Sequence, residues 1–426
     1  MGSLLWAPVA RTTAIRIMRS MRRFLRLLTI GIRTGEVLVV AISLYQTAIT
    51  AVGYRSYLRK KGVSPELPDS LPRFGLIVCA RNEEAVIGRI VRDLLAQDYP
   101  VELRDVLVIA HNCSDDTARA AARAGGTVVE LSTKIAGKAE AIEAGMAALG
   151  SAYDFIGVFD ADFRVPEDFL GQIASHSRDE DCLQAEVVPI ADADWLAEGY
   201  GFGRRARNLF WWRPREALRL STTISGSGWF IRPEVFAKYS TDSWTLTEDL
   251  ELSARLVADG HRVAYVSRAP IACGEARELR ASLQQRARWV RGHIGVVKGR
   301  WLPLAGAAVR GNASAADMAI YLVAPTRLLT RLGVSTATVL GLFVPALRLP
   351  AGIVWLALAG EWVVPGYIGW REKLVRLSTG SLDLALRHSM LSLLWFPIGI
   401  WAMATARLRA WHAMPRIMAQ ETNHVG

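Results

Sequence analysis

The chain has 426 residues, 51% of them hydrophobic, and it carries a net charge of +11 at pH 7. Its length gives room for one large or two ordinary domains, and its apolar residues concentrate near the N-terminus and after about residue 315. The positive charge does not indicate nucleic-acid binding, because the basic residues do not interleave with aromatic ones on a recognisable module. Arginines beside apolar segments favour contact with anionic lipids instead. The four cysteines have neither metal-ligand spacing nor a disulfide framework, which suits a reducing compartment.

The N-terminal region has two different parts. Residues 1–34 contain seven arginines separated by leucine, isoleucine and methionine, a pattern typical of a basic helix that lies in the membrane interface. No compact apolar region with a small-residue cleavage site follows, so a cleaved signal peptide is not indicated. Residues 35–54 carry only the charge of Glu36 and predict one transmembrane span, with a buried helix of a soluble protein as the alternative.

Residues 71–300 alternate between strand and helix patterns. Strands are predicted at Phe74–Cys79, Asp105–Ala110, Gly126–Leu131, Phe155–Phe159 and Arg262–Ser267. Helices are predicted at Glu83–Gln97, Asp115–Ala124, Ala136–Leu149 and Pro166–Ser177. This alternation predicts an α/β domain with a mostly parallel sheet, helices on both faces and ligands at the carboxyl ends of the strands.

The apolar run Phe155–Phe159 ends in two carboxylates, Asp160 and Asp162. Successive side chains of an extended segment point to opposite faces, so these two share one face. Hard oxygen donors at the end of a buried strand suit Mg2+ or Mn2+ bridging a diphosphate. The alternative is that Asp162 only starts a loop, or caps a helix that follows Pro166.

Polar residues follow the other predicted strands as well. The first strand runs into a turn with Ala80, Asn82 and Glu83, and the second runs into His111 and the Asp115–Asp116 pair. No P-loop and no G-x-G-x-x-G follows a strand, so a nucleotide here is not held by either phosphate loop. Lys138, at the start of a helix, has the reach to contact a phosphate, although a lone lysine there is more often solvated.

Two segments in the second half of the domain carry further candidates. Between residues 182 and 240 the periodicity fades, and Gly228 and Trp229 stand out as a close-approach glycine and a sugar-stacking ring, or as an ordinary turn with a packed tryptophan. Glu248 follows Thr245 at the spacing of a capping box, and this role at a helix start is sufficient to explain a glutamate at that position. Asp249 either favours the helix dipole or acts as a general base.

The region Gln284–Gly292 predicts a helix in which Gln285, Arg288 and Trp289 share one face. An arginine there neutralises a leaving diphosphate, and the neighbouring tryptophan forms the floor of an acceptor-sugar site. The alternative is a basic helix at the membrane interface, which we favour for Arg286 and Arg291.

After Pro303 the chain becomes apolar again. Ala316–Leu329 has an amphipathic pattern, and charges such as Arg327 and Glu361 soften the boundaries of the apolar segments. Three C-terminal spans, or four, are predicted, at Leu332–Leu347, Ala351–Trp370 and Met390–Leu408. We therefore expect residues 315–410 to form interfacial and transmembrane helices.

Together these motifs resemble the membrane-embedded family 2 glycosyltransferases, the inverting group that includes cellulose, chitin and hyaluronan synthases. The resemblance covers roughly residues 74–295 and rests on ordered motifs. They are the Ala80–Glu84 turn, the Asp115–Asp116 pair, Asp160-Ala161-Asp162, Thr247-Glu248-Asp249 and a Q-x-x-R-W match at Gln285–Trp289.

The resemblance implies a GT-A catalytic domain, a bound Mg2+ or Mn2+ and a role for each matched residue. It implies that Asp162, with Asp160, holds the metal on the diphosphate. Asp249 beside Glu248 deprotonates the acceptor, and Arg288 stabilises the leaving group. The residues that it places along the substrates are Ala80, Asn82, Glu83, His111, Asp115, Asp116, Lys138, Asp160, Gly228, Trp229, Gln285 and Trp289.

The resemblance also leaves alternatives open. His111 stands where many members carry an aspartate that reads the base, so a UDP-sugar is favoured while GDP- and dTDP-sugars remain open. The acceptor is a growing β-linked polysaccharide or, alternatively, a lipid or polyprenyl-linked molecule that receives one sugar. The alternative outside the enzymes is a non-catalytic membrane scaffold or a transporter.

The expected location is the inner or plasma membrane. We expect a multi-pass protein with a cytosolic catalytic domain and no large C-terminal regulatory domain. A single span at 35–54 would place the arginine-rich segment outside, against the positive-inside rule.

Overall fold

The computed structural model describes residues 7–62, 66–134, 137–191, 194–239, 245–324, 326–374 and 379–405. The chain divides into two compact units. One consists of residues 1–49 and 325–368, and the other consists of residues 50–324 and 369–426. The second unit contains the sheet and all the candidate site residues.

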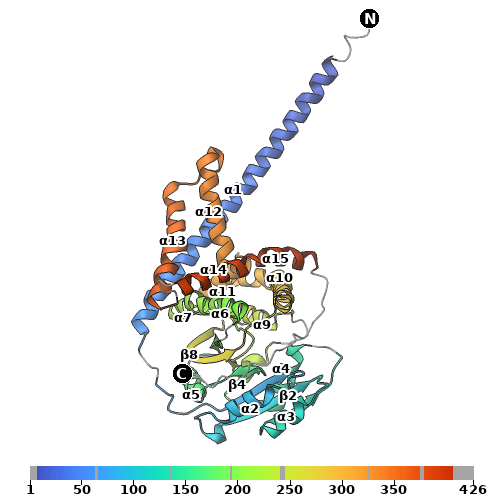
Figure 1. Cartoon of the computed structure of the whole chain (residues 1–426), viewed down its shortest axis with the longest axis vertical. Helices are drawn as coiled ribbons and strands as arrows, with labels where there is room; N and C mark the ends of the chain where they lie inside the picture. Colours follow the sequence, from blue (N-terminus) through green and yellow to red (C-terminus); the bar gives the residue numbers. More distant parts are fainter. Residues whose placement is uncertain are drawn as a thin grey trace. The chain divides into compact units, whose positions relative to one another are not determined.

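An eight-stranded sheet forms the centre of the second unit, with the strand order β3-β2-β1-β4-β7-β6-β8-β5 (Figure 1). The strands are β1 (Phe74–Ala80), β2 (Arg104–His111), β3 (Thr127–Leu131), β4 (Phe155–Asp160), β5 (Phe163–Arg164), β6 (Cys182–Pro189), β7 (Trp229–Ile231) and β8 (Val263–Cys273). The pairs β1–β2, β1–β4, β2–β3 and β6–β8 are parallel. The pairs β4–β7, β6–β7 and β5–β8 are antiparallel, so the sheet is mixed.

Helices cover both faces of this sheet, as the alternating pattern predicts. The helices of the domain are α2 (Ile87–Leu95), α3 (Thr117–Arg123), α4 (Lys138–Leu149), α5 (Phe169–Ala174), α6 (Trp195–Arg207), α7 (Arg213–Ala217), α8 (Pro233–Phe236) and α9 (Glu248–Ala258). Neighbouring residues of β1 pack on opposite sides. Leu76 joins a core with α2, α3 and α5, and Ile77 joins a core with α4 and α9. Two apolar layers therefore hold the sheet between helices and fix its carboxyl edge.

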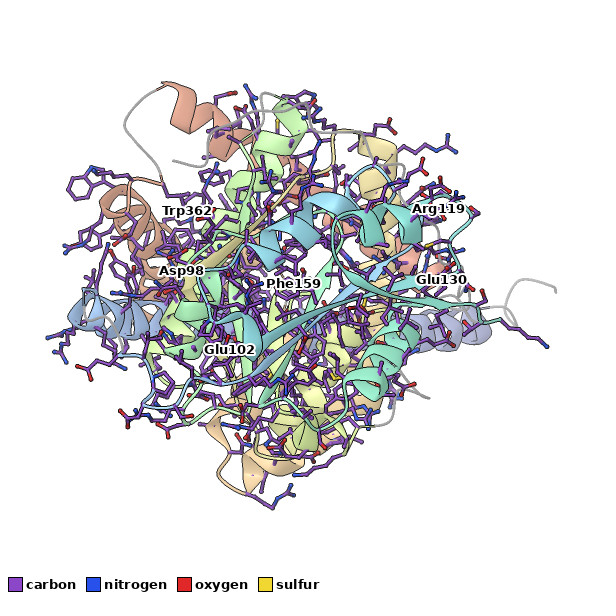
Figure 2. All side chains as sticks on the ribbon, turned by 90° about the horizontal axis from the view of Figure 1, so that it is seen from below. Asp98, Glu102, Arg119, Glu130, Phe159 and Trp362 are labelled. Atoms are coloured by element: carbon purple, nitrogen blue, oxygen red, sulfur yellow. The ribbon has the colours of Figure 1, made fainter. Side chains whose placement is uncertain are left out.

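Aromatic rings fill the centre of the first of these cores. Phe159 and Phe230 meet edge to face with ring centroids 5.8 Å apart, and Phe169 lies 6.0 Å from Phe159. In Figure 2, Arg119 of α3 and Glu130 of β3 lie on the same side of Phe159. Edge-to-face pairs of buried rings stabilise a core beyond their area. The end of β4, where Asp160 lies, is therefore held on a rigid support.

All five predicted strands are present, but two further strands were missed in the region where periodicity fades. β6 is a buried run, and β7 has only three residues between glycine-rich sequence and Pro233. The four predicted helices are also present, with later starts. For example, the helix predicted at Glu83–Gln97 begins at Ile87, because residues 81–86 form a turn. Residue 136, the predicted start of the helix Ala136–Leu149, lies outside the described residues.

Four more helices complete the second unit. They are α10 (Leu279–Val309), α11 (Ala313–Val323), α14 (Thr379–Leu393) and α15 (Trp395–Ala404). α11 is not the amphipathic interface helix predicted at Ala316–Leu329. It ends at Val323, buries Met318 and Leu322, and pairs Asp317 with the buried Arg215 at 2.7 Å. Figure 1 shows α14 and α15, in red, lying across α6 and α10, in agreement with their contacts.

The first unit consists of helices. α1 (Ala7–Lys60) is continuous through the predicted change at residue 35, and its residues up to Ile49 belong to this unit with α12 (Arg327–Phe343) and most of α13 (Ala351–Arg371). Glu361 is completely buried and accepts a hydrogen bond from Ser43 at 2.9 Å. Arg327 and Arg331 lie 3.3 and 3.5 Å from its carboxylate. The charges that interrupt the apolar pattern therefore neutralise one another.

Two helices in the described ranges are long and apolar enough to cross a membrane, at Arg19–Lys60 and Ala351–Arg371. These helices contain the spans predicted at 35–54 and Ala351–Trp370, whereas the multi-pass arrangement stays a prediction. α12 stops at Phe343, before the predicted end at Leu347. The span predicted at Met390–Leu408 is divided at Leu394 between α14 and α15, and its last three residues lie outside the described ranges. The helices α14 and α15 pack on α6 and α10 of the second unit.

Candidate active site

A half-buried lysine and the carboxylate at the end of β4 form the centre of the candidate site. Lys138, the first residue of α4, lies with its Nζ 2.8 Å from Asp160 Oδ1 and also donates to the carbonyl of Gly226. Ser227 Oγ contacts the backbone nitrogen of Asp160 at 3.1 Å. Burial disfavours the lysine charge, but Asp160 above all, with Cys79 and Glu248, outweighs it and raises the pKa of Lys138. The solvated alternative for Lys138 is therefore wrong.

Asp249 faces the same place from α9. Gly226 has φ +84°, and a Cβ built on it would lie 3.8 Å from Asp249 Oδ2 and 3.9 Å from Asp160 Oδ2. Both carboxylates thus lie within 4 Å of the position that a Cβ of residue 226 would occupy. Burial, and then the neighbouring Glu248, raise the pKa of Asp249 to about 7, against the opposing effects of Lys138 and Arg288. A carboxyl with such a pKa accepts a proton readily near neutral pH.

Glu248 does not take part in the predicted capping box. The residue at the N-cap of α9 is Thr247, whose side chain makes no cap hydrogen bond, and Thr245 Oγ1 lies 3.4 Å from Thr247 Oγ1 instead. Glu248 lines a small hollow with Gly226 and Asp249. Thr245 and Glu248 have the spacing of a capping box, but α9 begins two residues later than such a box would require. The structural explanation for Glu248 therefore fails.

α10 brings Arg288 to the same region. Its Nη1 lies 3.5 Å from the carbonyl of Leu246, and its charge lowers the pKa of Asp249. Gly292 of α10 packs directly on Thr247, where any side chain would collide with the threonine. Close packing at this glycine therefore sets the position of Arg288 relative to the start of α9.

The turns after β1 and β2 hold one another. Asn82 has φ +55° and accepts a hydrogen bond from the backbone of Ser114 at 2.8 Å. Asp115 accepts from Thr117 and from the backbone of Glu84, and these hydrogen bonds lower its pKa against the effect of burial. The backbone of Glu83 in turn donates to Thr117 Oγ1 at 2.7 Å. Both carboxylate oxygens of Asp115 are therefore engaged within the protein.

The other candidate residues of these turns, Ala80, Asp116 and His111, each contact a different partner. Asp116 pairs with Arg119 at 2.7 Å, and the carbonyl of Ala80 lies 3.6 Å from the thiol of Cys113. The buried His111 contacts Thr133 Oγ1 at 2.9 Å through Nε2 and lies 3.4 Å from Glu140. The predicted contact between His111 and a nucleobase stays a prediction, and these partners compete with it.

Gly228 and Trp229 have structural roles rather than the predicted substrate contacts. Gly228 has φ +69°, and a Cβ there would lie 2.3 Å from Ile271 Cδ1. Its backbone joins β4 to β6 through hydrogen bonds to Val158 and Ala185 at 2.8 Å. Trp229 is 2% exposed and packs in the α4 core, so its ring is not a platform for a sugar. The residues of this stretch that contact the candidate site are Gly226 and Ser227, whereas the sequence analysis singled out Gly228 and Trp229.

Gln285 and Trp289 lie on α10, half-buried, on the face predicted from their spacing. Arg286 lies among aromatic rings. Its guanidinium lies 3.9 Å from the ring centroid of Tyr200, 5.0 Å from that of Trp395 and 5.7 Å from that of Trp289. These rings stabilise its charge, and its position at the membrane interface stays a prediction.

The carboxylates that are suited to a divalent cation are Asp160 and Asp162. In the described part of the chain, no group of three or more His, Cys, Asp or Glu side chains is arranged to hold a metal by itself. Mg2+ commonly takes only one or two carboxylates and completes its shell with substrate phosphates and water, so this donor set fits. Asp162 lies in the turn after β4, beyond the extended segment, so the shared-face argument does not position it.

The family follows from comparison with known proteins. The model described as glycosyltransferase-like family 2 matches residues 72–292, which contain every candidate site residue. The chain belongs to this family. By class it is a glycosyltransferase, and its mixed α/β sheet is GT-A-like. The cellulose and chitin synthase-like subtype stays a prediction.

Among curated proteins, this family 2 chain is 28% identical to the β-monoglucosyldiacylglycerol synthase of Synechocystis over 231 residues, 52% of this chain and 48% of that enzyme. It is 25% identical to the probable glycosyltransferase YdaM of Bacillus subtilis over 297 residues, 61% of this chain and 65% of that protein. The match thus spans about half the length of the synthase.

Two solved structures are similar in fold. One is a mannosyltransferase from Pyrobaculum calidifontis in complex with GDP-Man and Mn2+, with a TM-score of 0.45, 15% identity and coverage of 80% of this chain and 99% of that one. The other is the glucosyl-3-phosphoglycerate synthase from Mycobacterium tuberculosis in complex with Mg2+ and UDP. Its TM-score is 0.38, with 16% identity and coverage of 57% of this chain and 82% of that one.

Proposed function

We propose that this protein is an inverting, metal-dependent glycosyltransferase that moves one sugar from a nucleotide-sugar donor to a lipid acceptor at a membrane surface. The observation that carries the chemistry is the position of Asp249. Its carboxylate has a raised pKa, and Asp249 Oδ2 and Asp160 Oδ2 both lie within 4 Å of the position that a Cβ on Gly226 would take. A base and a donor-side carboxylate around one open point are what a single displacement at an anomeric carbon requires.

In this mechanism Asp249 takes the proton from the acceptor hydroxyl. The hydroxyl oxygen forms a bond to the anomeric carbon while the bond from that carbon to the phosphate oxygen breaks, and the nucleoside diphosphate leaves with the electron pair. One in-line step inverts the configuration. Lys138 and Arg288 supply positive charge near the leaving group. A divalent ion held by Asp160 and Asp162 would neutralise further charge on the diphosphate.

The surface of α14 and α15 supports a lipid acceptor. Both helices expose large apolar side chains, namely Leu386, Met390, Leu393, Phe396, Ile400, Trp401 and Met403. Exposed apolar helices that pack on a soluble unit are typical of binding in the plane of the membrane interface. Relatives named β-monoglucosyldiacylglycerol synthase support the same acceptor class.

The test supplies the full-length protein, in neutral detergent with Mg2+ or Mn2+, with radiolabelled UDP-, GDP- and dTDP-sugars and membrane lipid extract. We expect a small product that extracts into organic solvent. The second candidate is a polysaccharide synthase, which the Q-x-x-R-W match at Gln285–Trp289 favours. A long product that a glycanase digests would replace the lipid-acceptor proposal by that function.

A further inference from the structure

A buried carboxylate in the first turn of α9 takes no part in the mechanism described above. Glu251 is the fourth residue of this helix and is only 2% exposed. Its Oε2 accepts a hydrogen bond from the backbone nitrogen of Thr245 at 2.6 Å, and its Oε1 accepts one from Arg300 Nη2 of α10 at 2.7 Å. Glu251 therefore connects α9, the stretch before it and α10.

The stretch before α9 is also pressed against α10 by two glycines. A Cβ on Gly292 would lie 2.6 Å from the side chain of Thr247, and a Cβ on Gly295 would lie 2.9 Å from that of Thr245. The two glycines are three residues apart, so they share one face of α10. A side chain at either position would push α10 away from the threonines. Residues 245–247 therefore have a fixed position on this face, and Glu251 is hydrogen-bonded to a fixed partner.

The start of α9 has no ordinary cap. The side chain of the N-cap residue, Thr247, makes no cap hydrogen bond, and Glu251 reaches back past it to Thr245. The negative charge of Glu251 in the first turn also favours the helix dipole. These effects stabilise the helix whether or not it carries a base, so they do not by themselves assign Glu251 a role in the reaction.

The position of Glu251 relative to Asp249 goes beyond stability. Residues two positions apart in an α-helix point about 200° apart, so these two carboxylates leave α9 on opposite sides. Asp249 lies near Gly226, whereas Glu251 is held by Thr245 and Arg300. Rotation of the first turn about its axis would break both hydrogen bonds of Glu251. These bonds therefore fix the direction in which Asp249 points.

We propose that Glu251 is a positioning residue that holds Asp249 towards the acceptor hydroxyl. This inference rests on the proposed function, in which Asp249 is the base, and Glu251 itself takes no proton in it. A displacement of about 1 Å in a reacting group costs about a hundred-fold in rate. The contacts of Glu251 with Thr245 and Arg300 therefore contribute to the rate of transfer as well as to folding.

The experiment replaces Glu251 by glutamine in the full-length protein, in neutral detergent and with the donor found active on lipid extract. The amide keeps the size of the side chain but has one acceptor oxygen, so one of the two hydrogen bonds is lost. We expect Glu251→Gln to lower kcat by about ten- to a hundred-fold without changing KM for the donor. In the Asp249→Asn background the same substitution should have little further effect on transfer, because residues that act as a unit are not additive. A role in stability alone does not produce this dependence on Asp249.

Two further variants complete the test. Asp317→Asn is the matched control, because Asp317 is another buried carboxylate that pairs with an arginine of the same unit. It should lose stability but keep its kcat. Arg300→Met removes one partner of Glu251 at a more exposed position, and it decides the question if Glu251→Gln does not fold. Its kcat should fall by about three- to ten-fold.

Each other outcome has a definite meaning. A wild-type kcat in folded Glu251→Gln or folded Arg300→Met protein overturns the inference and leaves Asp249 as the base. An equal loss from Glu251→Gln with and without Asp249 also overturns it, since Glu251 would then act apart from the base. A loss confined to KM for the donor would assign Glu251 to donor binding instead. A fully active Asp249→Asn protein removes the base itself and the proposed mechanism with it.

Discussion

Lys138 Nζ lies 2.8 Å from Asp160 Oδ1, and the same nitrogen donates to the carbonyl of Gly226. The lysine begins α4, whereas the carboxylate ends β4, so one ion pair links the helix and the strand on either side of the site. Because the pair is partly withdrawn from solvent, each charge gains stabilisation from the other. This pair aligns Asp160 and keeps a positive charge beside the position proposed for the diphosphate.

Replacing this lysine tests its contribution to donor binding. Lys138→Met leaves Asp160 without its cation and Gly226 without its donor, and we expect kcat/KM for the nucleotide sugar to fall by about ten- to a hundred-fold. Steady-state kinetics at varied donor concentration measure the change. Lys134→Met, at an exposed position just before the helix, is the control and should behave as wild type. Unchanged donor kinetics in Lys138→Met would remove the lysine from the donor site.

Asp249→Asn tests the proposed base. The amide keeps the size of the side chain but cannot take a proton, so transfer should fall by about 100- to 10,000-fold. Nucleotide affinity, measured by calorimetry, should persist. Asp179→Asn, at an exposed position, is the control. Substantial transfer by Asp249→Asn would exclude this carboxylate as the base.

The raised pKa of Asp249 predicts a pH profile. A base must be deprotonated to act, so kcat/KM should rise as the pH passes through about 7. The negative charge of Glu248 is one cause of the raised pKa, so Glu248→Gln should move the rise to lower pH. Rates at saturating metal across the neutral range measure the midpoint of both proteins. A midpoint that stays in place in Glu248→Gln would contradict the coupling between the two carboxyls.

The same pKa predicts an effect on stability. Folding favours the protonated form of Asp249, so this contribution is complete below the ordinary carboxyl pKa and is lost as the pH rises through about 7. Asn does not titrate. The melting temperature of Asp249→Asn relative to wild type should therefore increase between acidic and mildly alkaline pH, as thermal unfolding in one detergent would show. A constant difference would mean that Asp249 has an ordinary pKa in the folded protein.

The sequence predicted the central parallel strands β1, β2 and β4 because each contains a continuous apolar run. β1 and β4 are buried on both faces, so their composition alone distinguishes them from loops. β7 has three residues, too few for a period of two to be visible, and it is the strand that reverses the sheet direction. The antiparallel pairing of β7 with β4 and β6 could therefore not be predicted from the sequence.

The candidate site was predictable where a polar residue ends a strand or begins a helix. Asp160 and Asp249 are of this kind, and their positions follow from local pattern. Gly226 comes from another part of the chain, the loop before β7, and it reaches the site only through the tertiary packing of that loop beside Asp160 and Asp249. The glycine- and serine-rich stretch before Trp229 indicated a close approach to the backbone. The sequence analysis chose Gly228 and Trp229 in this stretch rather than Gly226.

The pair Arg215–Asp317 should support the fold rather than the chemistry. Both side chains are at least 96% buried and lie 2.7 Å apart, with Arg215 also stacked on Trp211. Asp317→Asn leaves an uncompensated buried guanidinium and should cost about 3–5 kcal/mol of unfolding free energy. Arg119→Ala breaks an exposed pair and should cost no more than about 1 kcal/mol. Chemical denaturation followed by tryptophan fluorescence compares the two variants. Equal losses of unfolding free energy would show that burial does not increase the contribution of the Arg215–Asp317 pair.

Gly226→Ala tests whether the open point between the two carboxylates is where the reaction takes place. The alanine Cβ fits without collision, 3.8 Å from Asp249 Oδ2 and 3.9 Å from Asp160 Oδ2, but φ +84° strains it by about 1–2 kcal/mol. We expect modest destabilisation and a much larger loss of transfer, because the methyl group occupies the space between base and donor. Gly171→Ala in α5 is the matched control. It has open space and helical geometry, so it should be as stable as wild type or slightly more stable, and fully active. If Gly226→Ala loses stability but keeps its rate, the reacting atoms lie elsewhere, and the role of Asp249 as a base must be reconsidered with them.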